Sequence, residues 1–352
     1  MPYSVVDLFC GVGGLTKGLE LANLNVVAGI DIEESCRFAY EVNNDAIFVQ
    51  ADVSQIQPEE IANFYPDEGL RILVGCAPCQ PFSKYTKRYR KEGYQDDKWK
   101  LLYSFAKIVS ELRPSIVSME NVPELEKESV FHDFVKQLEA IGYRCSWSIA
   151  YCPDYGVPQR RKRLVLLASL LGEIGLVPPL YTDDNYLTVR DAIGGLAVLQ
   201  SGEIDVNDPV HSATKLNQIN LERIRSSIPG GTWNNWEEHL KLACHKKKTG
   251  KGYGAIYGRM EWDKPSPTIT TQFYGYGNGR FGHPEQDRAI SYREGAILQS
   301  FPRDYNFFQD DGKISKRQLG IQIGNAVPVE LGRAIGISIT KHLEEMGVES
   351  DG

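Results

Sequence analysis

The chain has 352 residues, enough to bury a substantial core in one large domain or in two unequal ones. Its composition is 42% apolar and 24% charged, and it has no apolar run long enough to cross a bilayer, which excludes a membrane-spanning protein. The net charge of −7 argues against an indiscriminate nucleic-acid binder, although net charge hides how the charges are distributed.

The cysteines and the first residues indicate a reducing compartment. Seven cysteines scattered through a long chain make a poor disulfide framework, because the count is odd. The amino-terminal residues contain no basic segment followed by a long apolar run, so we expect no secretion signal. These features predict a cytoplasmic protein.

The first half of the chain alternates between two kinds of segment. Apolar runs bounded by turn residues predict strands at Val5–Phe9, Val26–Ile30, Arg71–Gly75, Ser115–Met119 and Leu164–Ala168. Helical spacing predicts helices at Leu15–Leu24, Leu101–Leu112 and Val130–Ile141. This alternation predicts a doubly wound α/β fold of the Rossmann-like type, with a parallel sheet and a ligand at the carboxyl ends of its strands.

The pattern changes after Ala168. Residues 178–293 are richer in Gly, Pro, Asn and aromatic residues, and their helical spacing is sustained only over Lys215–Ile228. Helical spacing returns at Val329–Met346. We therefore expect a second, smaller and irregular domain, followed by a final helix.

Residues 7–15 (DLFCGVGGL) follow the first predicted strand and open a helix. Glycines at this place let the backbone approach a ligand closely. Asp31 ends the second strand, where a carboxylate can bind ribose hydroxyls, and Asp52 follows the presumed third strand, near enough for an adenine amine. The pattern fits an adenosyl ligand, and it fits NAD nearly as well.

The fourth predicted strand ends in residues 75–83 (GCAPCQPFS), which contain a Cys-x-x-Cys pair. A structural zinc would need a second pair of ligands, and a redox pair would normally open a helix in a smaller fold. The third interpretation makes Cys79 a nucleophile and Cys76 a core residue of the strand. Glu120 follows the fifth strand, and residues 158–163 (PQRRKR) precede the next one, so an acid and arginines are expected beside the thiol.

In their order and spacing, six segments resemble the motifs of the cytosine-5 DNA methyltransferases, in the compact form typical of bacterial modification enzymes. They are DLFCGVGGL, GCAPCQPFS, MENV, PQRRKR, REGAILQSFP (Arg293–Pro302) and IGNAVP (Ile323–Pro328). The resemblance covers nearly the whole chain except about residues 178–282. It implies a catalytic domain over 1–177 that is completed by 322–352, and a target-recognition domain over 178–321.

The resemblance also implies the chemistry. Cys79 would attack C6 of a cytosine that has been rotated out of double-stranded DNA, because C5 is otherwise a poor nucleophile and is inaccessible in a duplex. Glu120 would hold N3 and the exocyclic amine, and Arg161 and Arg163 would hold O2 and support the loop. The base that removes the C5 proton is not identified, and a water molecule could serve.

The implied cofactor is S-adenosylmethionine, which would leave as S-adenosylhomocysteine, with no metal. Its expected contacts come from the strand ends and from the IGNAVP segment. They are Phe9, Gly11, Gly13, Leu15, Asp31, Ile32, Asp52, Val53, Pro78, Leu101, Asn325 and Val327.

DNA contacts are expected in two regions. The segment Lys84–Lys91 (KYTKRYRK) directly follows Cys79 and interleaves basic and tyrosine residues, which is typical of a lid over the flipped base. In the variable region the candidates are residues 233–236 (WNNW) and residues 268–276, with arginines as guanine contacts. The expected DNA-binding residues are Ser83, Lys84, Lys87, Arg88, Arg259, Thr268 and Arg280.

Rival hypotheses differ in identifiable features. RNA-methylating relatives carry a Cys-Phe-Thr element or a second catalytic Thr-Cys, and neither is present. A dehydrogenase or a non-catalytic DNA-binding module would not need the set of Cys79, Glu120 and the two arginines. The expected setting is a bacterial cytoplasm, in contact with the nucleoid and not with a membrane. A cognate restriction endonuclease would be a genetic rather than a physical partner.

Overall fold

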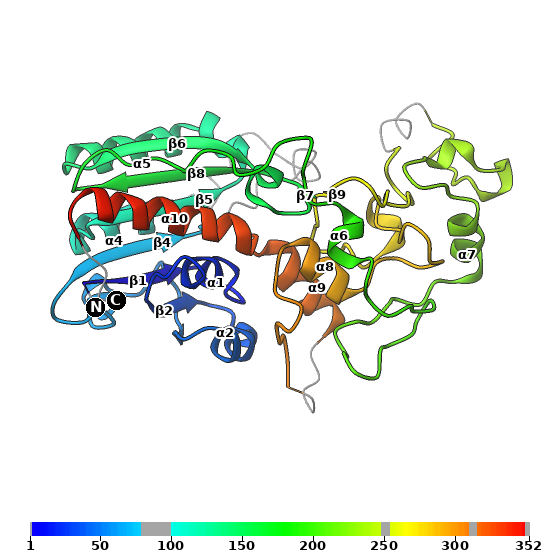
Figure 1. Cartoon of the computed structure of the whole chain (residues 1–352), viewed down its shortest axis with the longest axis horizontal. Helices are drawn as coiled ribbons and strands as arrows, with labels where there is room; N and C mark the ends of the chain where they lie inside the picture. The colour runs from blue at the N-terminus through cyan, green and yellow to red at the C-terminus, as the bar shows by residue number, and fades with distance from the viewer. Residues whose placement is uncertain (1, 79–99, 248–253, 310–314, 349–352) are drawn as a thin grey trace. The chain divides into compact units, whose positions relative to one another are not determined.

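The computed structural model describes residues 2–78, 100–247, 254–309 and 315–348 (Figure 1). The chain folds into two compact units. Unit 1 contains Met1–Tyr155, Lys162–Leu180 and Val327–Gly352, and unit 2 contains Gly156–Arg161 and Tyr181–Ala326. The assignment of catalysis to one domain and target recognition to the other remains a prediction, because packing alone defines these units.

A seven-stranded sheet forms the centre of unit 1, in the order β3-β2-β1-β4-β5-β8-β6. Its strands are β1 (Tyr3–Leu8), β2 (Val26–Asp31), β3 (Ile47–Gln50), β4 (Leu70–Gly75), β5 (Ile116–Asn121), β6 (Arg144–Tyr151) and β8 (Lys162–Ser169). Every residue of β1 and β5 is buried, as expected of apolar strands covered on both faces. The strand order reverses between β1 and β4, and such a reversal opens a ligand-binding crevice at the carboxyl ends.

The sheet is not parallel throughout, so that expectation is corrected. Strands β1 to β5 run parallel, whereas β8 is antiparallel to both β5 and β6. Strand β6 was not predicted from the sequence, and it lies at an edge of the sheet. Its burial pattern is mostly exposed or intermediate, so it lacks the apolar run that marks the inner strands.

Helices cover both faces of the sheet (Figure 1). Helices α1 (Gly14–Glu20) and α10 (Val329–Glu345) pack against each other, so the carboxyl-terminal helix returns to the first strand's neighbourhood. Helices α3 (Pro58–Ala62), α4 (Lys100–Leu112) and α5 (Ser129–Ala140) pack in sequence, and α2 (Arg37–Asn43) contacts β3. Among the described helices, none is both long and apolar enough to cross a membrane.

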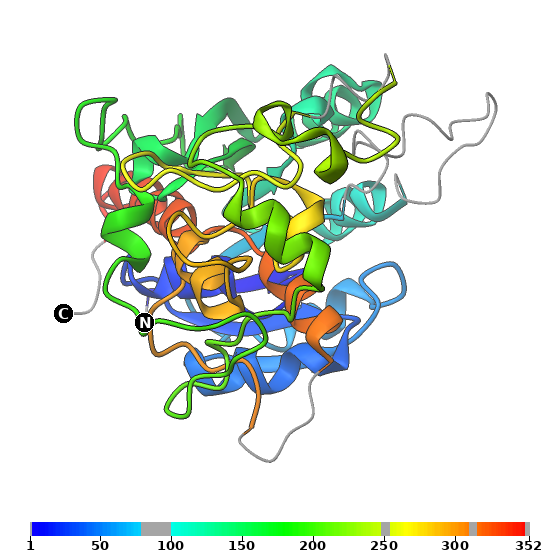
Figure 2. The same ribbon diagram turned by 90° about the vertical axis from the view of Figure 1, so that its right-hand side faces the viewer.

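Unit 2 consists of short elements joined by long irregular segments (Figure 2). Strand β7 (Gln159–Arg160) pairs with β9 (Ser266–Pro267), which ties the PQRRKR segment to this unit. Its helices are α6 (Val189–Ile193), α7 (Gln218–Arg225), α8 (Tyr292–Leu298) and α9 (Lys316–Asn325). Helix α7 begins three residues later than predicted because the Asn217 side chain caps its amino end, accepting from the Asn220 amide.

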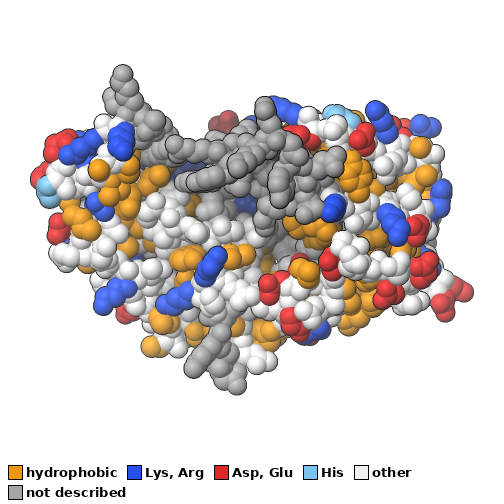
Figure 3. Space-filling model, turned by 180° about the vertical axis from the view of Figure 1, so that it is seen from behind, with side chains coloured by type: hydrophobic (Ala, Val, Ile, Leu, Met, Phe, Trp, Pro, Cys, Tyr) orange, Lys and Arg blue, Asp and Glu red, His pale blue; other side chains and the backbone are white. Residues whose placement is uncertain are grey.

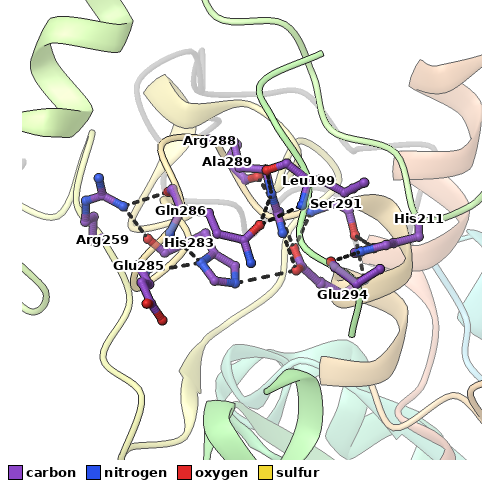
Figure 4. Close-up of polar contacts among 11 residues, drawn as sticks. Leu199, His211, Arg259, His283, Glu285, Gln286, Arg288, Ala289, Ser291 and Glu294 are labelled. Atoms are coloured by element: carbon purple, nitrogen blue, oxygen red, sulfur yellow. Dashed lines mark hydrogen bonds and ion pairs between the residues drawn. The ribbon is translucent and has the colours of Figure 1, made fainter. Parts of the chain in front are cut away.

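A buried ion pair organises the interior of unit 2 (Figure 4). Arg288 is fully buried, and its two terminal nitrogens each donate to one oxygen of Glu294 at 2.7 Å. Ser291 caps α8 by accepting from the Glu294 amide, and Glu294 accepts from the Ser291 amide in return. His283 Nε2 lies 3.7 Å from Glu294. The acid of the REGAILQSFP segment therefore joins α8 to the segment that precedes it, residues 283–291.

Candidate active site

The loop after β1 has an unusual backbone. Phe9, Gly11 and Gly13 all adopt left-handed conformations, with φ of 61°, 52° and 86°. Glycine tolerates this region, whereas a phenylalanine there is strained, a feature that often marks ligand-binding sites. The Gly11 amide donates to Asp31 Oδ2 at 2.9 Å, which ties the loop to the end of β2. A Cβ on Gly11 would meet no atom within 4 Å, so the loop leaves room for a ligand to approach its backbone.

An acidic residue is followed by an apolar residue at the end of β2 and again just after β3. Burial raises the pKa of the Asp31 carboxyl, and the Glu33 and Gly11 amides oppose that shift. The adjacent Ile32 is 65% exposed, an apolar surface suited to the face of a purine. Asp52 Oδ1 accepts from the Ser54 amide at 2.8 Å, and the adjacent Val53 is buried.

The other expected cofactor residues lie in different environments. Leu15 is buried in α1, Pro78 is exposed after β4, and Leu101 is half-buried in α4. Asn325 is exposed at the end of α9 in unit 2, whereas Val327 is buried in unit 1. Their contact with a cofactor stays a prediction.

Glu120 is the centre of a compact polar cluster in unit 1. It is 2% exposed near the end of β5. Arg163 Nε lies 2.8 Å from Glu120 Oε1, an ion pair without the alignment of a hydrogen bond. Cys76 Sγ donates to Glu120 Oε2 at 2.8 Å. The structure thus brings the predicted acid and one predicted arginine together at the carboxyl edge of the sheet.

Two residues of this region were not identified from the sequence. Cys76, interpreted as strand core, lies just beyond β4 with its thiol on Glu120. Asn121, which is buried, donates from its side-chain nitrogen to the Ala77 carbonyl at 3.0 Å and so ties the segment leading to Cys79 to β5. The sequence could have indicated Asn121, because it directly follows Glu120 in the MENV motif. Cys79 itself lies outside the described residues.

Arg161 belongs to unit 2, and its partners are main-chain carbonyls. Its guanidinium donates to the Ile269 carbonyl at 3.0 Å and to the Gly324 carbonyl at 3.5 Å. Gln159 is fully buried and donates to the Leu298 carbonyl at 3.0 Å and to Gln299 Oε1 at 2.8 Å. These contacts join the PQRRKR segment to the segments around it, and the role expected for Arg161 stays a prediction.

The expected DNA-binding role of Arg259 is corrected by its surroundings. The residue is 5% exposed, and its guanidinium donates to main-chain carbonyls of Ile224, Ser227, His283 and Gln286 and pairs with Asp287. Such a group stabilises the interior of unit 2, and its donors are directed away from solvent. In the WNNW candidate, Trp233 and Trp236 are buried core residues beside His245, whereas Asn234 and Asn235 are exposed, so base contact by this segment stays a prediction for its asparagines.

Of the other expected DNA contacts, two are at least partly exposed in unit 2 and four lie outside the described residues. Thr268 is exposed and donates to the Arg160 carbonyl at 2.8 Å, and Arg280 is half-buried with Nη1 on the Gly231 carbonyl at 2.5 Å. Ser83, Lys84, Lys87 and Arg88 lie outside the described residues. On the face shown in Figure 3, the Lys and Arg side chains of the described residues are scattered singly or in small groups.

Comparison with known proteins gives a consistent result. The family model described as C-5 cytosine-specific DNA methylase matches residues 3–341. Type II methylase M.HgiDII of Herpetosiphon aurantiacus is 53% identical over 344 residues, covering 97% of this chain and 96% of its own. Type II methyltransferase M.Sau96I of Staphylococcus aureus is 31% identical over 354 residues, covering 97% and 77%. Among solved structures, a DNA modification methyltransferase encoded within an E. coli prophage has a TM-score of 0.75 at 22% identity. The match covers 97% of this chain and 99% of that chain and shows that the two share a fold.

Proposed function

The chain belongs to the C-5 cytosine-specific DNA methylase family and is a DNA (cytosine-5)-methyltransferase, and from this premise we propose that Cys79, Glu120 and Arg163 activate the target cytosine. The observation that carries the proposal is the ion pair between the buried Glu120 and the half-buried Arg163. It lies at the carboxyl edge of the sheet, where the segment leading into Cys79 leaves β4. A buried carboxylate beside a guanidinium is suited to hold the edge of a polar base.

The reaction needs a nucleophile because C5 of cytosine does not attack a methyl donor unaided. The Cys79 thiolate adds to C6, and the electron pair displaced from the C5–C6 double bond makes C5 nucleophilic. After the methyl group has joined C5, a base removes the C5 proton and the C6–S bond breaks. The double bond is restored, and Cys79 is regenerated.

Glu120 and Arg163 act on the polar edge of the same ring. Glu120 holds N3 and the exocyclic amine, and Arg163 holds O2, so that the negative charge pushed into the ring by the thiolate is stabilised. Arg161 holds the PQRRKR segment through its main-chain contacts. These assignments divide the two arginines between substrate binding and support.

The family uses S-adenosylmethionine, which supplies an electrophilic methyl group. The residues present fit it: the open space at Gly11 admits the ligand to the loop backbone, Asp31 suits ribose hydroxyls, and the exposed Ile32 suits adenine. Asp52 and Phe9 complete the proposed adenosine contacts. The other expected cofactor residues remain part of this proposal.

Two relatives carry the name type II methylase or methyltransferase, and the same class is proposed for this chain. Its substrate would be a cytosine flipped out of double-stranded DNA, with Ser83, Lys84, Lys87, Arg88, Thr268 and Arg280 as the contacts that remain proposed. A cognate restriction endonuclease would be its genetic partner, in the cytoplasm beside the nucleoid.

One assay tests the nucleophile and the substrate together. The protein is incubated with labelled S-adenosylmethionine and with separate DNA and RNA pools, and then with a duplex that contains 5-fluorocytosine. Because fluorine cannot leave C5 as the proton does, the enzyme should remain bound through C6. We expect label in DNA and a denaturation-resistant adduct that Cys79→Ser abolishes.

The matched control is Cys244→Ser, which removes an exposed cysteine of unit 2 and should leave both results unchanged. Label found only in RNA would overturn the substrate. An adduct that persists in Cys79→Ser would overturn the nucleophile. Glu120→Gln should lower the methylation rate by about a hundredfold or more, since general acid–base groups contribute 10²–10⁴-fold.

A further inference from the structure

Cys76 contacts the proposed substrate-binding acid although the mechanism above gives it no part. Its Sγ lies 2.8 Å from Glu120 Oε2, and Arg163 Nε lies 2.8 Å from the other oxygen, Oε1. The two partners therefore hold opposite oxygens of one carboxylate that is 2% exposed. Residues 76 and 120 are 44 positions apart, so the contact exists only because β4 and β5 are neighbours.

The thiol can serve as a donor because it stays protonated. Burial raises the pKa of the Cys76 thiol well above its ordinary value, and the nearby charge of Glu120 raises it further. A thiolate there would repel the carboxylate, whereas S–H donates to it. This environment is the opposite of the electropositive one that activates a nucleophilic cysteine.

We propose that Cys76 is a positioning residue for methyl transfer, whose thiol fixes the Glu120 carboxylate against rotation so that it meets the flipped cytosine in one orientation. The inference rests on the proposed role of Glu120. With Arg163 on Oε1 alone, the carboxylate could turn about its last side-chain bond. The thiol on Oε2 removes that freedom, and preorganisation of this kind matters most in the transition state.

The thiol also suits a carboxyl group that shares a proton with N3 of the base. Sulfur is both a weak donor and a weak acceptor, so it can face Oε2 whether that oxygen is ionised or protonated. A lysine or arginine at position 76 would add a second positive charge and bind the ionised form alone. The Cys76 thiol thus donates a hydrogen bond to Glu120 without adding a charge.

The test compares Cys76→Ala, which removes the donor, with Cys76→Ser, which keeps one. Steady-state methylation of duplex DNA should show kcat about tenfold lower in Cys76→Ala, with the KM for DNA within about twofold of wild type, since the lost hydrogen bond to a charged group acts on the transition state. Cys76→Ser should restore kcat to within about threefold. Cys152→Ala removes another buried thiol of unit 1 and is the matched control, with wild-type kcat expected.

A double-mutant cycle separates this inference from the proposed function. Cys76→Ala should slow adduct formation with 5-fluorocytosine DNA in the wild-type background and have no further effect in Glu120→Gln, because the two residues act as one unit. Additive effects, or a Cys76→Ser variant as slow as Cys76→Ala, would overturn the positioning role. Full activity of Glu120→Gln would instead overturn the proposed function, and thermal unfolding of each variant would identify a folding defect.

Discussion

At the scale of single residues, Asp7 shows what burial does to a charge beside the proposed cofactor loop. It is 1% exposed in β1, and Thr16 donates to its Oδ2 at 2.8 Å, while Oδ1 has no partner among the described residues. Burial raises the pKa of Asp7 to about 7 against the opposing Thr16 hydrogen bond, with the charge of Asp31 raising it further. The folded protein therefore keeps Asp7 protonated up to a higher pH than the unfolded chain does.

This residue predicts a pH dependence of stability. Because the pKa is higher in the folded state than the ordinary value of 3.8 for the unfolded chain, the Asp7 contribution to stability is fully present below about pH 3.8, is lost as the pH rises to about 7, and levels off above that. Between pH 6 and 8 the Asp7 contribution should fall by about 1 kcal/mol. Asp7→Asn, which stays neutral, should remove that slope in urea unfolding measured across this range. An unchanged slope would show that Asp7 is ionised throughout.

At the scale of elements, the contact between α1 and α10 depends on two glycines. A Cβ at Gly18 would overlap the backbone of Val329, Gly332 and Arg333, and a Cβ at Gly332 would lie 3.0 Å from the Leu15 carbonyl oxygen. Backbone atoms cannot move aside as the end of a side chain can. The absence of side chains at these positions is what allows the carboxyl-terminal helix to pack on the helix that follows the proposed cofactor loop.

Gly18→Ala should therefore destabilise the protein by about 1–3 kcal/mol, since the overlap forces the helices apart. The expected sign is informative because alanine favours a helix by about 1 kcal/mol over glycine and would otherwise stabilise α1. Guanidinium unfolding measures the change. Gly175→Ala is the control: its Cβ would make one ordinary contact, 3.9 Å from Ser146 Oγ, and stability should not change. Equal stability of the two variants would contradict the packing argument.

At the scale of the whole molecule, the two units should respond to pH in opposite directions. Burial lowers the pKa of His283 in unit 2 to about 4, so the unfolded chain binds that proton first. Its contribution is present above about pH 6.5 and is lost as the pH falls toward 4. Burial alone would raise the pKa of Glu294, but Arg288 outweighs it and holds the value at about 2, which adds a further loss below about pH 4.5.

Hydrogen exchange between pH 4 and 8 should detect the difference. Amides of unit 2 should lose protection below pH 6.5 before those of unit 1, with a decrease of about 3 kcal/mol at pH 4 from His283. His283→Gln should delay that loss. Arg288→Met should destabilise unit 2 at every pH by about 3–5 kcal/mol, because it leaves Glu294 buried without its cation. Uniform loss of protection in both units would refute the assignment.

The alternation of strands and helices, the family resemblance and the residues at the strand ends could be predicted from the sequence, because these follow from local hydrophobic spacing and from short motifs. Asp31 and Glu120 lie where strand-end reasoning predicted them. The direction of β8 and the existence of β6 were decided by pairing between distant segments, which local spacing does not encode. An edge strand with few buried residues carries little sequence signal.

The contacts of each polar side chain could not be predicted from the sequence and are known from the folded chain. Arg259 and Arg163 are chemically identical, yet one is enclosed by main-chain carbonyls of unit 2 and the other lies against Glu120. The sequence predicts Cys76 to be a core residue of its strand, but in the structure its thiol donates to Glu120, because β4 and β5 are neighbours. The physical reason is shared: burial and hydrogen bonding of a side chain depend on neighbours that arrive from elsewhere in the chain, and a sequence motif specifies residue types without specifying those neighbours.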